Sequence, residues 1–205
     1  MPGHPVMEEV TQDRLEYAED GSVTLTLRRP LKTRDGELGF LTLRRPNWDD
    51  FLRQAKAPGS ELDRTAWLLA RLSGVDAVDF DGIDAADAIL LAETVGEFID
   101  QRGDLMQAHA DRIEIDEEGA NLRLRSPVKT KDGDVEVVSL RRPTFKEMRQ
   151  HQAAAGGEFT AMAKLIAALT GIGPLSLGQI DALDGLILST LVASFLQSGR
   201  SSGAR

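Results

Sequence analysis

The sequence predicts an α+β fold made of two tandem copies of one small domain, each a three-stranded antiparallel meander followed by about three helices. Three observations support this prediction. The chain repeats itself once along its length. Each copy opens with segments in which apolar and charged residues alternate, as in half-buried strands. Each copy then continues with segments in which apolar residues recur at helical spacing.

The repeat is long and has no gaps. Segment 25–98 aligns with segment 122–195 at a constant spacing of 97 residues. This spacing is well above the roughly 20–50 residues of solenoid and propeller repeats, so it indicates two small globular domains. We also expect polar, flexible ends and a short linker between the copies. The expected divisions are an N-terminus at 1–12, domains at 13–98 and 112–197, a linker at 99–111 and a C-terminus at 198–205.

Each copy is predicted to begin with three strands. The first hairpin is indicated by alternation in Arg14–Tyr17 and in its counterpart Arg112–Ile115, each followed by an acidic turn that ends in glycine. A second turn carries Asp35-Gly36 in the first copy, and glycine there supplies the positive φ of a tight turn. The third strands are expected at Leu38–Leu43 and Val135–Leu140.

A helix should follow each sheet directly. Thr144 and Glu147 have the spacing of a capping box, and Asn47 with Asp50 forms a weaker version in the first copy. Glycine-rich breaks separate these short helices from a second helix in each copy. The second helices are expected to end at Gly74 and Gly171, and the third to run from about Asp79 to Phe98 and from about Ser176 to Phe195.

Composition limits the class of protein. The net charge of −9 is carried entirely by the first 105 residues, and an acidic chain with only local arginine pairs argues against nucleic-acid binding. No apolar run approaches the ~20 residues of a membrane span, and the first residues do not resemble a secretory signal. The sequence has no cysteine, so it has neither disulfides nor thiolate zinc ligands. We therefore expect a cytoplasmic protein that does not bind membranes.

An acidic run in the first copy is the strongest candidate for a chemical site. The run does not have the spacing of an EF-hand calcium loop. With Gly82 at loop position 6, alanines stand at positions 1 and 12, where the loop needs oxygen ligands. A metal-binding or enzymatic module built on the retained pairs Asp84/Asp87 and Asp181/Asp184 is the least favoured alternative, because no histidine, lysine or third acid is placed to join them. We predict no catalytic, cofactor or metal site and read the acids as complements to helix dipoles. The run comprises Asp76, Asp79, Asp81, Asp84 and Asp87.

The step from the third strand to the first helix is the candidate partner-binding region. It carries an arginine pair and two large apolar residues at matching positions in both copies. Such arginines can hold a carboxylate-rich partner, although solvated or locally paired arginines are more common. The apolar residues fit either core packing or an exposed contact. The candidates are Trp48, Phe51, Arg44 and Arg45 in the first copy, and Phe145, Met148, Arg141 and Arg142 in the second.

Three motifs of the second copy carry a family resemblance. They are Leu140-Arg141-Arg142-Pro143-Thr144-Phe145, the run from Leu165 to Ile172, and Ile180-Asp181-Ala182-Leu183-Asp184 ahead of a last apolar helix. The first copy repeats part of this pattern. The chain resembles the small tail assembly chaperones of contractile-tailed phages and prophages, of the Mu-like tail protein E type. It departs from them in being duplicated, where a single copy is expected.

The resemblance implies a function without catalysis or cofactor. A chaperone of this type would bind the tape measure protein, and other tail proteins as further partners, in the host cytoplasm. It would keep the tape measure protein soluble until the tail tube polymerises. The alternative is a structural or adaptor protein that remains in a phage tail or a related assembly.

Overall fold

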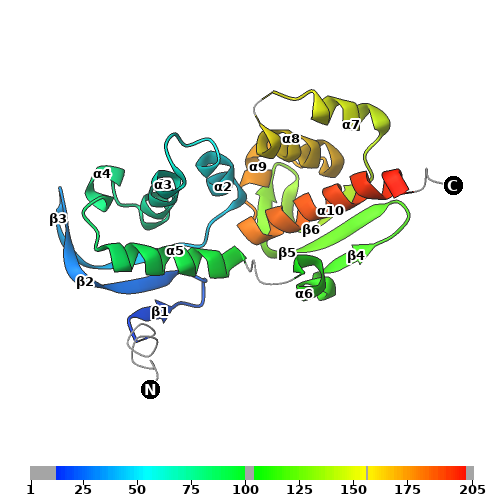
Figure 1. Ribbon diagram of the computed structural model, residues 1–205. Coiled ribbons are helices and arrows are strands. Elements are labelled where there is room, and N and C mark those ends of the chain that lie inside the picture. The colour runs from blue at the N-terminus through cyan, green and yellow to red at the C-terminus, as the bar shows by residue number, and fades with distance from the viewer. Residues whose placement is uncertain (1–12, 100–103, 156, 202–205) are drawn as a thin grey trace, which may run out of the picture. The chain divides into compact units, whose positions relative to one another are not determined.

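The computed structural model has the α+β fold that the sequence predicts. Two three-stranded antiparallel sheets are each followed in the chain by helices, in two repeated halves (Figure 1). The predicted tails and linker fall partly outside the described residues, at 1–12, 100–103 and 202–205. The structure describes residues 13–99, 104–155 and 157–201.

The chain forms two compact units, which divide it differently from the sequence repeats. The first unit contains the chain up to Pro46 together with Lys56–Phe98, and the second contains Asn47–Ala55 and the chain from Ile99 onward. The helix α2, Trp48–Gln54, therefore belongs to the first repeat by sequence and to the second unit by its contacts.

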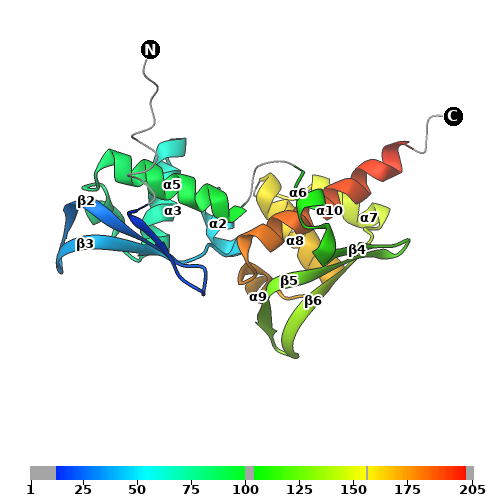
Figure 2. The same cartoon turned by 90° about the horizontal axis from the view of Figure 1, so that it is seen from below.

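In the first unit the sheet order is β1-β2-β3, and the helices cover one face of the sheet (Figure 2). Both strand pairs are antiparallel. The elements are β1 Leu15–Tyr17, β2 Val23–Thr33, β3 Gly36–Leu43, α3 Glu61–Ser73, α4 Ala77–Phe80 and α5 Ala85–Ile99.

The second unit repeats this plan with the order β4-β5-β6. The described part of the predicted linker contains a short helix and one 3-10 turn. Besides α2, the elements are α6 Leu105–Ala108, η1 Ala110–Arg112, β4 Ile113–Ile115, β5 Gly119–Thr130, β6 Gly133–Arg141, α7 Phe145–Gln152, α8 Glu158–Thr170, α9 Pro174–Gly178 and α10 Ala182–Ser201.

The two long hairpins have the same register. Thr33 pairs with Gly36 in one sheet, and Thr130 pairs with Gly133 in the other. The φ angles of these glycines are 133° and 121°, a region that favours glycine. The Asp-Gly sequences therefore close the turns as predicted.

Both long strands carry an irregularity at the same place. The register of β2 against β3 shifts between Thr26 and Leu31, and that of β5 against β6 shifts between Arg123 and Val128. A bulge leaves backbone groups outside the ladder, and these groups need other hydrogen-bond partners.

The long third helices begin later than the sequence predicted. A separate short helix, α4 or α9, comes first and buries Phe80 or Leu177 in the core. The chain then turns, and Asp84 accepts a hydrogen bond from the Ala86 N–H at the start of α5. An aspartate in that position caps a new helix rather than continuing the previous one.

The second unit has one connected apolar core. It joins the inner faces of β5 and β6 to α8 and α10, and it includes Trp48 from α2. Within the described ranges, no helix is both long and apolar enough to cross a membrane.

Candidate partner-binding site

The helix α2 is firmly capped and packs on α9 and α10 of the second unit. The Asn47 N–H donates to Asp50 Oδ2 at 2.9 Å, and the Asp50 N–H donates to Asn47 Oδ1 at 3.0 Å. The predicted weak capping box is thus complete. The Trp48 N–H donates to the Ile180 carbonyl at 2.9 Å, which ties the first turn of α2 to the start of α10.

Trp48 anchors α2 on the second unit. Its side chain is 1% exposed, and its ring lies directly on Gly185 of α10. A β-carbon at position 185 would overlap with the indole, so a glycine is required for this contact. Beside it, the Asp49 side chain lies against Gly178 of α9.

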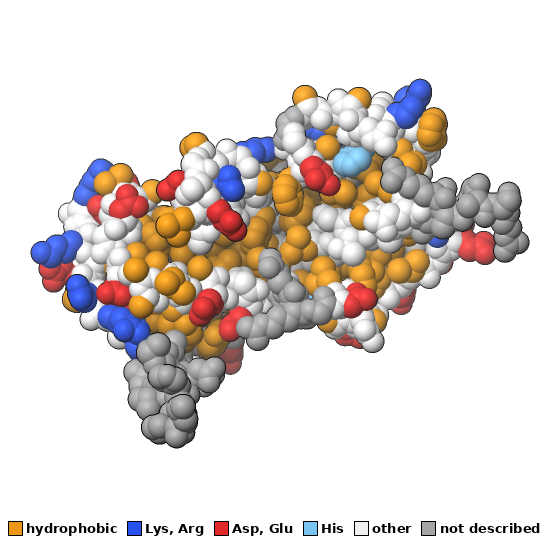
Figure 3. Space-filling view, viewed as in Figure 1, with side chains coloured by type: hydrophobic (Ala, Val, Ile, Leu, Met, Phe, Trp, Pro, Cys, Tyr) orange, Lys and Arg blue, Asp and Glu red, His pale blue; other side chains and the backbone are white. Residues whose placement is uncertain are grey.

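An apolar groove opens beside Trp48. It has a volume of about 350 Å³ and lies between α8 and α10, where hydrophobic side chains gather on the surface (Figure 3). The Trp48 Nε1–H is buried and has no hydrogen-bond acceptor among the described residues. The lining residues are Trp48, Glu158, Phe159, Met162, Leu186, Ser189, Thr190 and Ala193.

A second groove of about 250 Å³ continues the first toward α7. The two share Glu158, Met162 and Ala193, so they form one surface between α2 and α7. We call this surface the apolar groove. The second part is lined by Met148, His151, Gln152, Glu158, Met162, Ala193, Leu196 and Gln197.

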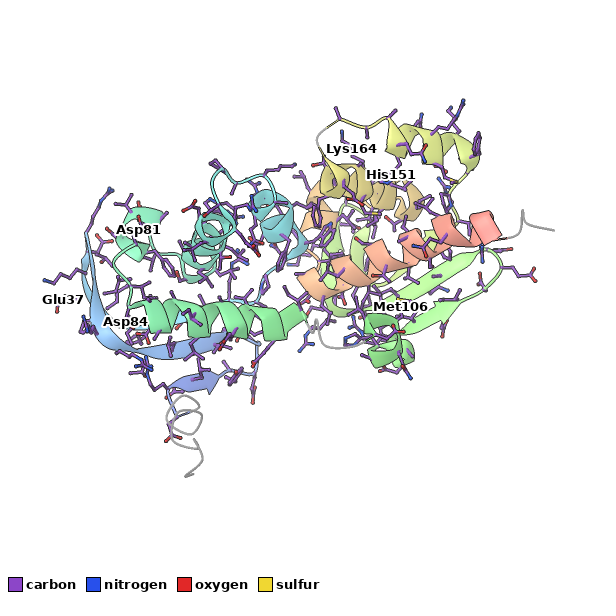
Figure 4. The ribbon with its side chains drawn as sticks, in the orientation of Figure 1. Glu37, Asp81, Asp84, Met106, His151 and Lys164 are labelled. Carbon is purple, nitrogen blue, oxygen red and sulfur yellow. The ribbon has the colours of Figure 1, made fainter. Side chains whose placement is uncertain are left out.

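The far end of the apolar groove is formed by α7. His151 lies between α7 and α8 (Figure 4), and its Nδ1 is buried with no partner among the described residues. Met148 lines the groove and is half-buried. Phe145 is 72% exposed and does not line either part of the groove.

An ion pair fixes the start of α7. Arg141 Nη2 donates to Glu147 Oε1 at 2.5 Å, and Glu147 also accepts from the Thr144 N–H at 2.8 Å. The Arg141 guanidinium and the Thr144 donors lower the pKa of Glu147 to about 2. The predicted box of Thr144 and Glu147 is thus present.

The second arginine of each pair contacts the last helix of its own repeat. Arg45 lies 4.9 Å from the Phe98 ring centroid, and Arg142 lies 4.9 Å from that of Phe195. Such cation–π contacts join the end of the sheet to the end of the helix. Arg44, the first arginine of its pair, is exposed, and its guanidinium donates to the Arg45 carbonyl at 3.0 Å.

Of the eight predicted partner-binding residues, the structure brings Trp48 and Met148 to the apolar groove. Phe51 is half-buried on α2 and does not line the groove. A partner contact for all eight stays a prediction. Sequence reasoning missed Phe159, Met162 and Ala193, which read as ordinary members of helical stripes.

The retained aspartate pairs have structural roles. Asp87 is fully buried, forms an ion pair with Arg14 at 2.5 Å, and accepts from the Arg28 N–H at 2.8 Å. The Arg28 N–H lies in the bulge of β2, so the carboxylate satisfies a group that the sheet leaves unpaired. Asp84, at the start of α5 (Figure 4), caps that helix.

The second unit repeats this arrangement. Asp184 is fully buried, forms an ion pair with Arg112, and accepts from the Arg125 N–H at 2.7 Å. Burial raises the pKa of Asp184, and the Arg125 and Arg112 donors oppose that shift. Asp181 caps α10 through the Leu183 N–H. The spacing of the pair is thus explained by one cap and one bulge anchor.

Two other acids of the run also have local partners. Asp76 accepts from the Val78 N–H at 3.0 Å, and Asp79 accepts from the Arg34 N–H at 3.2 Å. Asp76 thus caps α4, and Asp79 holds the β2–β3 turn.

These features define a duplicated α+β protein with an apolar surface groove in its second unit. The family of phage tail assembly chaperone proteins, E, or 41 or 14, matches residues 24–100 and again residues 121–197. The chain belongs to this family, in a tandem duplication, as the resemblance implied. No curated protein and no solved structure matches the chain.

Proposed function

We propose that the chain is a non-catalytic tail assembly chaperone that binds the tape measure protein through the apolar groove. Family membership supports the chaperone role. The groove supplies the contact surface, with an apolar floor made by Phe159, Met162 and Ala193. An amphipathic helix laid in such a groove buries its apolar face and exposes its polar face, which keeps the complex soluble.

The apolar lining of the groove, which includes the exposed Phe159 together with Met162 and Ala193, is the observation that carries this proposal. Removing these apolar side chains from water against the apolar face of a client helix supplies the gain in affinity. Glu158 adds a charged group that both parts of the groove share and that can select basic residues of the client.

The binding takes place in the host cytoplasm, before the tail tube polymerises around the tape measure protein. The negative charge of the chain supports solubility of the complex. Other tail proteins are further candidate partners.

The test is co-expression of the chain with the tape measure protein of the same phage or prophage. We expect a soluble complex that co-purifies with the wild type and is lost with Phe159→Glu, which places a charge in the groove. Phe159 is 53% exposed, so this change leaves the core intact. The control is Phe40→Glu on β3, which is 62% exposed in the first unit and should bind as the wild type does.

If both variants bind the tape measure protein as the wild type does, the groove assignment is overturned. A tape measure protein that stays insoluble and unbound with the wild type would overturn the chaperone proposal. Recovery of the chain in purified tails would instead favour the adaptor alternative.

A further inference from the structure

The first unit carries a counterpart of the apolar groove. Phe159 and Leu186 both line the groove between α8 and α10 of the second unit. At the constant spacing of 97 residues, their counterparts are Leu62 on α3 and Ile89 on α5. Because both units have the same order of strands and helices, Leu62 and Ile89 border one surface between α3 and α5.

Two large apolar side chains are exposed on this surface. Leu62 is 77% exposed and Ile89 is 60% exposed. Hydrophobic side chains gather over α3 and α5, with Asp and Glu side chains beside them (Figure 3). Exposed apolar residues with a polar rim are typical of a protein contact surface. We call the surface formed by the counterparts of the groove residues, Glu61, Leu62, Thr65, Ile89 and Glu93, the α3–α5 face.

The α3–α5 face differs from the apolar groove in charge. Glu93 stands on α5 where Thr190 lines the groove, so it adds a second carboxylate to that of Glu61 on α3. Both glutamates are exposed, and neither forms an ion pair within the described part of the chain. Glu93 follows Ile89 by one helical turn, so the two side chains lie on the same side of α5. The face therefore combines apolar contacts with negative charge that the first unit leaves unneutralised.

A helix with an apolar stripe between basic residues complements this face. Its stripe would remove Leu62 and Ile89 from water, and its lysines or arginines would lie against Glu61 and Glu93. The net charge of −9 lies entirely in the first 105 residues, so the field around the face favours a cationic partner.

We propose that the α3–α5 face binds a basic amphipathic helix of a second partner protein, distinct from the client of the apolar groove. The two units then hold segments of different chemistry, more apolar in the second unit and more basic in the first. This inference does not rest on client binding by the groove.

The test measures binding of two synthetic helical peptides to the full chain by fluorescence anisotropy. Both peptides have the same leucine stripe, and one carries lysines where the other carries glutamates. We expect the basic peptide to bind more tightly. Leu62→Ser and Ile89→Ser should each weaken its binding about tenfold, and both positions are exposed, so folding is preserved. Phe159→Ser, at the position corresponding to Leu62, is the matched control and should bind the basic peptide as the wild type does.

Charge reversal gives the sharper result. Glu93→Lys should weaken binding of the basic peptide about tenfold and strengthen that of the acidic peptide. Glu37→Lys changes the net charge equally on β3 (Figure 4), and it should alter neither. Equal effects of the two reversals, or binding that only Phe159→Ser removes, would overturn the proposal. A wild type that sediments as a dimer and dissociates with Ile89→Ser would assign the face to a second copy, which would also overturn it.

Discussion

The first helix after the sheet has opposite environments in the two repeats. In the first repeat, Trp48 of α2 is 1% exposed, while its counterpart Phe145 of α7 is 72% exposed. Both helices have a complete capping box, so local sequence specifies the helix in each case. Trp48 is buried because its ring lies on Gly185 of α10, at a place where a β-carbon would overlap with the indole.

A second difference separates the apolar groove from its counterpart in the first unit. Met162 and Thr190 line the groove, and the corresponding residues of the first repeat are Thr65 and Glu93. The first repeat is thus more polar at these positions. The two units have thus diverged at these positions, and the proposed function places client binding in the second.

The largest expected effect comes from truncating the buried aromatic. We predict that Trp48→Ala lowers the free energy of unfolding of the second unit by about 3–5 kcal/mol, because it leaves a cavity on Gly185. The exposed counterpart, Phe145→Ala, should change it by no more than about 0.5 kcal/mol. Urea unfolding measures both, and equal losses would contradict the difference in burial.

The next effect tests a feature that the units share. We predict that Asp184→Ala costs about 3 kcal/mol, because it leaves the Arg112 guanidinium and the Arg125 N–H without their carboxylate. Asp87→Ala should cost a similar amount, since Asp87 anchors the bulge of β2 in the same way. Unfolding that is sensitive to only one substitution would show that the two anchors are not equivalent.

A smaller effect is expected from the cation–π contacts. Arg142→Gln should destabilise the second unit by about 1 kcal/mol, through loss of the contact with Phe195. Arg45→Gln should do the same for the first unit through Phe98. Thermal unfolding measures both shifts, and a change in binding without a change in stability would instead favour a direct partner role for these arginines.

The smallest effect is a pH dependence that belongs to α7. Because the pKa of Glu147 is lowered to about 2, its ion pair stabilises the fold above about pH 4.5 and is lost as pH falls toward 2. The Arg141 side chain is half-exposed, and screening by solvent keeps the contribution of the pair below about 1 kcal/mol. We predict that Glu147→Gln flattens this part of the profile of stability against pH. An unchanged profile would contradict the ion pair.

Much of the fold follows from local sequence. Alternating residues and Asp-Gly turns predict the strands, because each side chain has a clear preferred face. The extra short helices α4 and α9 were missed, because their turns depend on Phe80 and Leu177 packing in the core. The pairing of Asp87 with a bulge in β2 was also not predictable, since it joins residues far apart in the chain.

The candidate site was predicted only in part. Trp48 was identified as a large apolar residue, but its attachment to the second unit depends on Gly185, more than a hundred residues away. The apolar groove combines α8 and α10 with α2 and α7, so no local pattern reveals it. The repeat itself holds the missing signal, in positions where one copy is apolar and the other is polar.

The most direct test of the chaperone account is site-specific photocrosslinking during co-expression with the tape measure protein. A photoreactive residue at Ala193 lies in the apolar groove, and one at Gly96 occupies the corresponding position of the first repeat. We predict crosslinks to the tape measure protein from position 193 and far fewer from position 96. Crosslinks from position 96 alone, or from neither position in a soluble complex, would contradict client binding by the groove.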